Sequence, residues 1–194
     1  MLGEDEITSI DDDLPRAKAI RTNYAVARDA TLEAHEWSFA IKQFKPQLLA
    51  EPPLWQYRYA YSIPPDILRV LAVERMPDGM FNNITTGASA YSDGRRQRRE
   101  VDHEVQGREI LTNEEDIYCT GIRQVKEEGL FSNLFCHALA AKLAMLICYR
   151  VTESNSKFDR VTGLFGGFIQ EARSRDGMQS STRRMRNNTF ARVR

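Results

Sequence analysis

The side chains that could carry out acid–base, nucleophilic or metal chemistry are widely separated in this sequence. His35, His103 and His137 fall in different segments, and they show no metal-ligand spacing with one another or with the cysteines. The acidic pairs Glu114-Glu115 and Glu127-Glu128 are typical of solvated loops. Because no nucleophile, base and orienting group can be assembled from these positions, we expect no enzymatic activity, no metal and no cofactor.

The cysteines lie within apolar sequence, and no secretory signal precedes them. Cys119, Cys136 and Cys148 are therefore expected to be reduced packing residues of an intracellular protein. His137 follows Cys136 directly, so the two side chains point to different faces of a helix. Core packing is the prediction for both.

A glycine-rich stretch, GLFGG at residues 163–167, invites comparison with phosphate-binding loops. It lacks the Lys-Ser/Thr pair of such a loop and lies within a helical pattern. We expect Gly163, Gly166 and Gly167 to let another helix approach closely instead.

Composition places the chain among ordinary globular proteins, with 194 residues, 42% hydrophobic and 28% charged residues, and a formal net charge of +0. The charge is unevenly distributed, since residues 1–13 carry acidic side chains and no base, whereas arginine dominates the stretch after Ile169. Solvated termini and a contact with a partner are the two interpretations of this asymmetry.

Apolar periodicity indicates the elements that hold these residues. Spacings of three and four predict helices over residues 15–34, 130–152 and 157–175. Acidic residues 11–13 are expected to cap the first helix, and Asp176-Gly177 to end the last. The middle helix is apolar almost all round, so we expect other elements to wrap it.

Between the first two helices the period changes to two, which predicts strands. The prediction is an α+β fold, in which an inserted, mostly antiparallel β lobe interrupts a bundle of three main helices and an extended C-terminal arm follows. The expected boundaries are residues 1–36 and 129–175 for the helical core, 37–128 for the β-rich lobe and 176–194 for the arm.

The strongest strand signal runs from Trp55 to Ile63, where aromatic side chains alternate with other residues. This row is either a half-buried sheet face or a platform on which the bases of single-stranded nucleic acid stack. A return strand over 67–73 follows, and short segments at 100–105, 108–111 and 117–125 predict an antiparallel meander.

A long segment without periodicity, residues 76–99, lies within this lobe and is rich in Gly, Asn, Ser and Thr. We expect it to be mobile in the free subunit, because such loops are commonly mobile or functional. It ends in a basic cluster that is a candidate tail-contact or channel loop, made of Arg95, Arg96, Arg98 and Arg99.

The C-terminal arm places two apolar side chains within a basic ribbon. Such a ribbon either forms a disordered tail or docks in an acidic groove, where buried aromatic and Arg side chains commonly dominate the binding energy. The candidate partner-binding residues are Arg183, Arg184, Met185, Arg186, Phe190, Arg192 and Arg194.

Several segments follow one another in an order that covers nearly the whole chain: GEDEITSIDD, HEWSFA, WQYRYAYSIPPDILRVLAV, GREILTNEEDIYCTGIRQV and LFCHALAAKLAMLICYRVTESNSKF. In this order and combination the chain resembles the tail tubular protein A, or head-to-tail adaptor, family of short-tailed bacteriophages. None of the segments is specific by itself. Relatives usually carry an extra leading helix before the Gly-Glu segment, which has no counterpart ahead of Gly3-Glu4, so its contacts are not carried over.

The resemblance implies a structural virion protein, made in the host cytoplasm and located at the head-tail junction. It implies a ring of identical subunits, dodecameric in related assemblies, that binds the portal through its C-terminal segments and the tail nozzle on its far face. Double-stranded DNA would pass through the ring without sequence-specific binding, and no membrane is involved. The alternative function is a nucleic-acid-binding module that uses the aromatic strand and the basic loop.

Overall fold

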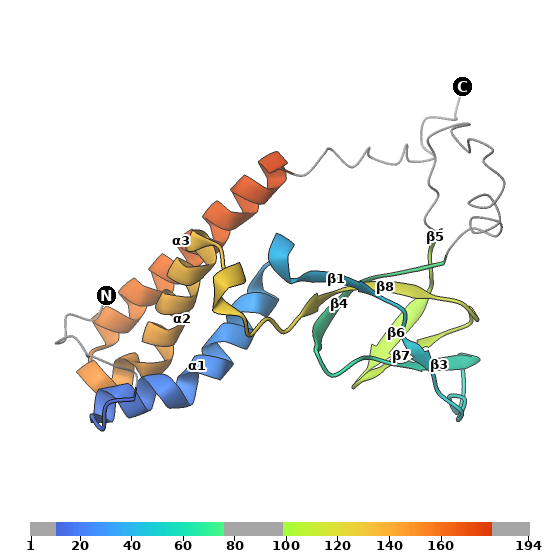
Figure 1. Ribbon diagram of the computed structural model, residues 1–194, viewed down its shortest axis with the longest axis horizontal. Coiled ribbons are helices and arrows are strands. Elements are labelled where there is room, and N and C mark those ends of the chain that lie inside the picture. Colours follow the sequence, from blue (N-terminus) through green and yellow to red (C-terminus); the bar gives the residue numbers. More distant parts are fainter. Residues whose placement is uncertain (1–10, 76–98, 180–194) are drawn as a thin grey trace. The chain divides into compact units, whose positions relative to one another are not determined.

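The computed structural model describes residues 11–75 and 99–179, which form two compact units (Figure 1). One is helical and the other, Glu36–Leu130, is built of strands; the chain passes between them at His35 and again at Phe131. The predicted α+β fold, with three main helices and an inserted antiparallel β lobe, is confirmed.

The helical unit consists of α1 (Pro15–Ala34), α2 (Asn133–Thr152) and α3 (Asn155–Gln179). The helix α2 contacts both of the others, as its apolar sequence predicts. Small residues of α2, Ala141 and Ala144, pack with Val161 of α3, and the aromatic rings of Phe165 and Phe168 cover this cluster. The wrapping of α2 is nonetheless incomplete, because Leu146 remains 41% exposed.

The helix ends differ in part from those expected. Leu14 is the N-cap of α1 and makes no side-chain cap hydrogen bond, so the predicted acidic cap is wrong. Asp13 instead forms an ion pair with the Lys18 ammonium at 2.6 Å. Ser132 caps α2, since its hydroxyl accepts a hydrogen bond from the Phe135 amide at 3.2 Å.

The helix α3 continues through Asp176-Gly177 to Gln179, so the predicted helix end, and with it the start of the predicted arm at 176, is wrong. A glycine lowers helix propensity by about 1 kcal/mol but keeps its backbone amide, so it does not by itself terminate a helix.

The β unit holds two antiparallel four-stranded sheets. The first has the order β1-β8-β4-β5, and the second the order β2-β3-β7-β6. The strands of the first sheet are β1 (Ile41–Phe44), β4 (Ile67–Arg75), β5 (Arg99–Glu100) and β8 (Tyr118–Arg123). Those of the second are β2 (Gln47–Leu48), β3 (Tyr59–Ser62), β6 (His103–Gln106) and β7 (Glu109–Thr112).

A single buried cluster joins the two sheets. Tyr61 and Ile110 enter it from the second sheet, and Val73 and Cys119 enter it from the first. This cluster explains why the predicted meander is wrong: β6 and β7 form a hairpin, but β8 pairs with β4 and β1 instead of β7. Because the chain crosses from one sheet to the other after β7, Ile117 and Cys119 are buried between the two sheets. If β8 extended the β6-β7 hairpin instead, both side chains would lie on one sheet.

Candidate interaction surface

The residues proposed from sequence to bind partners lie almost entirely outside the described residues. This holds for every candidate in the C-terminal arm and for Arg95, Arg96 and Arg98 of the basic loop. Arg99 begins β5, where it pairs with Arg75 of β4. The described structure therefore brings no two of these candidates together.

The aromatic row predicted over Trp55–Ile63 is an ordered strand only over Tyr59–Ser62, so its predicted start is wrong. Tyr61 is buried, and its hydroxyl donates to the backbone carbonyl of Glu115 at 2.5 Å or of Glu114 at 3.1 Å. Burial, followed by the negative charge of Asp116, raises the pKa of this phenol. With Tyr61 buried and Tyr59 packed against the same core, the strand presents a half-buried sheet face.

The residues that precede this strand form the most apolar exposed point of the β unit. Leu54 is 101% exposed and Trp55 is 78% exposed, in the loop that joins β2 to β3. We define Leu54 and Trp55 as the apolar tip. Proline precedes the tip at two successive positions, Pro52 and Pro53, and fixes φ at both.

Backbone hydrogen bonds hold the loop at its base and immediately after the apolar tip. The Leu49 amide donates to the Ala60 carbonyl at 2.8 Å, and the Tyr57 amide donates to the Trp55 carbonyl at 2.8 Å. Gln56, which lies between Trp55 and Tyr57, has a φ of 69°, a left-handed conformation that is uncommon outside glycine. The Arg58 amide then donates to the Asn113 side-chain oxygen at 3.1 Å, which ties the loop to the segment after β7.

Acidic side chains lie on the strand next to the base of this loop. Asp102 and Glu104 flank His103 of β6, and His103 and Tyr59 of β3 both pair with Thr112 of the intervening strand β7. Partial burial raises the pKa of Tyr57, and the negative charges of these two acids raise it further. Glu51 directly precedes the proline pair, and it is exposed. The surface around the base of the apolar tip is therefore mainly acidic. The exposed Arg58 is the nearest basic residue in the sequence of the loop.

The alternation of aromatic residues assigned Trp55 to the strand, so the sequence did not predict this exposed tip. Alternation alone does not distinguish a residue that pairs in a sheet from one that precedes the sheet. The available signal was the proline pair, which removes two amide donors and favours an extended or turning backbone over a central strand.

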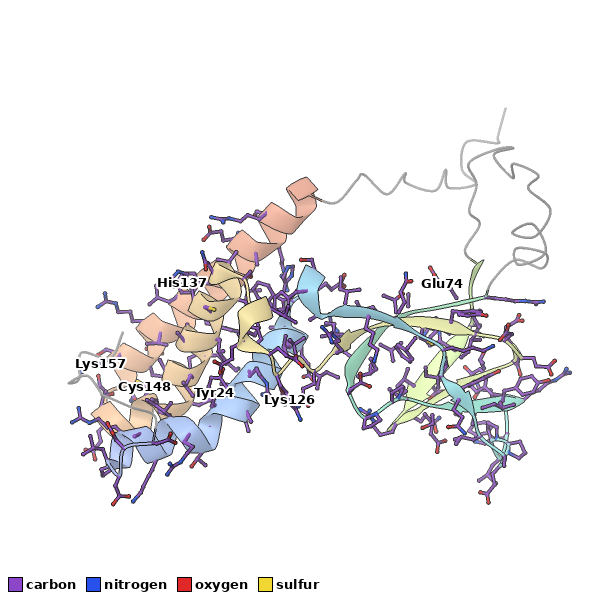
Figure 2. The ribbon with its side chains drawn as sticks, in the orientation of Figure 1. Tyr24, Glu74, Lys126, His137, Cys148 and Lys157 are labelled. Atoms are coloured by element: carbon purple, nitrogen blue, oxygen red, sulfur yellow. The ribbon has the colours of Figure 1, made fainter. Side chains whose placement is uncertain are left out.

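The helical unit contradicts two further predictions about chemical groups. Cys136 and His137 are both exposed, although core packing was expected; His137, near the start of α2 in Figure 2, stacks on Phe168 with ring centroids 5.5 Å apart. The predicted packing role of Gly163, Gly166 and Gly167 is also wrong within the described chain, because a Cβ added at any of them would meet nothing within 4 Å.

The surroundings of one thiol and of the possible metal ligands can be described directly. Burial raises the pKa of the Cys119 thiol to about 12, so this sulfur stays protonated and unreactive. Among the described residues, no group of three or more His, Cys, Asp or Glu side chains is arranged to hold a metal ion. None of the described helices is both long and apolar enough to cross a membrane.

No protein-family model and no curated protein matches this chain.

Proposed function

We propose that this chain is a head-to-tail adaptor of a short-tailed bacteriophage. Identical subunits form a ring beneath the portal, extend the channel through which DNA passes, and join that channel to the tail nozzle. The ring is dodecameric, as in the assemblies of the family that the sequence resembles. The protein has a structural role in this assembly and carries out no catalysis.

The observation that carries this proposal is the order of the resembling segments along the chain. These segments extend from the acidic start of the sequence, through the HEWSFA segment and the aromatic strand, into the apolar helix α2. The separation of the chain into a helical unit and a β unit gives additional support, because an adaptor must contact the portal and the nozzle with separate surfaces.

Electron microscopy of the purified protein mixed with its portal tests this proposal. We expect a ring of density on one face of the portal, coaxial with the portal channel. Portal particles that remain undecorated at saturating protein concentration would refute the adaptor function.

A nucleic-acid-binding module is the alternative outcome, and salt dependence distinguishes the two. Binding that neutralises several phosphates weakens steeply with salt, with a log–log slope of about −0.9 per phosphate on duplex DNA. An adaptor subunit should bind DNA weakly, because DNA must slide through the ring. Tight, strongly salt-dependent DNA binding without portal decoration would favour the alternative.

A further inference from the structure

The apolar tip consists of two large side chains that lie outside the buried core described for the β unit. Leu54 is 101% exposed and Trp55 is 78% exposed, whereas the other tryptophan, Trp37, is 3% exposed. We propose that the apolar tip is a docking site that inserts into an apolar pocket with a cationic rim on the tail nozzle protein. The identity of this partner rests on the proposed adaptor function.

The tip is held in place before any partner binds. Pro52 and Pro53 restrict the backbone on one side, and the hydrogen bonds of the Tyr57 and Arg58 amides hold it on the other. A loop fixed in one conformation loses less entropy on association, so more of the contact energy contributes to affinity. The left-handed Gln56, with a φ of 69°, is consistent with a loop whose shape is maintained for a purpose other than core packing.

Tryptophan is the residue type that most often dominates binding energy at a protein interface, and it does so from well-packed, desolvated pockets. Leu54 is adjacent in sequence and fully exposed, so it adds apolar surface beside the tryptophan. Since neither supports the fold, their removal separates binding from stability.

Charge decides which class of partner fits. Three exposed acids, Glu51, Asp102 and Glu104, outnumber the exposed Arg58 around the base of the loop, so the local charge is net negative. This negative charge disfavours the phosphates of nucleic acid and the head groups of an anionic membrane, both of which attract basic surfaces. A protein pocket edged with lysine or arginine is complementary to both the apolar tip and the acids around it.

The nozzle is the partner because the portal is assigned elsewhere. The C-terminal segment proposed to hold the portal continues the chain from α3 of the helical unit, whereas the apolar tip belongs to the β unit. An adaptor that binds both neighbours at once needs two separate surfaces, and the tip provides the second.

The test uses the full-length protein assembled on portal, with purified nozzle protein as the titrated partner. Trp55→Ala should weaken nozzle binding by about 30-fold or more, which corresponds to about 2 kcal/mol at 1.4 kcal/mol per tenfold. Trp55→Phe should retain most of the affinity, because it keeps an aromatic anchor. Val26→Ala, a change at an α1 side chain that is 60% exposed, is the matched control and should bind nozzle like wild type.

Each outcome bears on a different claim. Nozzle binding by Trp55→Ala that equals wild type, on portal that both proteins decorate, overturns the docking site and leaves the adaptor function intact. Wild-type protein that fails to decorate portal overturns the adaptor function and with it the named partner. Binding of wild-type protein, but not of Trp55→Ala, to phosphatidylglycerol vesicles would identify the tip as a membrane contact and overturn the proposal.

Discussion

The reactivity of a thiol depends on its exposure and on its pKa. The cysteines of this chain differ in exposure. Cys119 and Cys148 are buried, and Cys136 is exposed on α2. We expect Cys136 to react rapidly with a thiol-exchange reagent in the folded protein. Cys119, whose pKa burial raises to about 12, should react only after unfolding.

Absorbance-monitored labelling in buffer and then in denaturant measures these rates. Cys136→Ser should remove the rapid phase and leave the slow phase unchanged. A rapid phase that survives this substitution would show that Cys148 or Cys119 is accessible in the folded state.

Gly121 of β8 lies close against the neighbouring strand β4. A Cβ at this position would lie 2.8 Å from the backbone oxygen of Arg69 and 3.0 Å from a side-chain methyl of Ile67. Gly121→Ala should therefore destabilise the β unit by about 1–3 kcal/mol, the usual cost of overpacking. Urea denaturation, monitored by circular dichroism, provides the measurement.

Gly129→Ala is the matched control in the same unit, because an added Cβ there meets nothing within 4 Å. The two variants should differ clearly in midpoint. Equal midpoints would mean that the strands separate at little cost, contrary to the close contact at Gly121.

Single residues also show where sequence patterns lose information. The alternation that includes Trp55 continues unbroken into β3, but pairing begins only at Tyr59, opposite Thr112 of β7. The partner strand lies far away in sequence, so no local pattern specifies where pairing starts. Cys136 was misassigned for a similar reason, because exposure on α2 depends on where its neighbouring helices lie.

Helices were predicted more closely than strand pairings because their hydrogen bonds are local. The bounds of α1 matched the prediction at both ends, although its cap did not, since periodicity and Pro15 mark the start without any side-chain cap. The strands predicted over 67–73, 108–111 and 117–125 were close to β4, β7 and β8. The sheet to which β8 belongs, however, depends on contacts with β1 and β4. Those contacts lie outside any window of local sequence.

The helix α3 contains glycines that lower its stability without a visible packing benefit. Gly163, Gly166 and Gly167 have open space where a Cβ would lie. Gly163→Ala should therefore stabilise the helical unit by about 0.5–1 kcal/mol, because alanine loses less backbone entropy on helix formation. Chemical denaturation, monitored by helical circular dichroism, is the measurement.

The double variant Gly163→Ala/Gly167→Ala extends this experiment. An added Cβ meets nothing within 4 Å at either site, and helix propensities sum along a helix, so the second substitution should add a further gain. A loss of stability in either variant would mean that residues beyond the described part of the chain cover this face.

At the scale of the whole molecule, the proposed adaptor places its portal contact in the segment after α3. Because α3 continues to Gln179, a truncation that removes residues 180–194 keeps every residue of this helix. We expect its thermal unfolding to match that of the full-length protein while portal binding is lost. Calorimetry and a portal-binding titration measure the two properties separately.

The side chain that should matter most within this segment is Phe190, the aromatic anchor among its arginines. Phe190→Ala should weaken portal binding by about 2 kcal/mol or more if this ring fills a pocket, since large losses concentrate at such anchors. Thr189→Ala, the adjacent polar position, is the matched control and should change binding little. Full-strength portal binding by the truncated protein would refute the arm and move the portal contact to the helical unit.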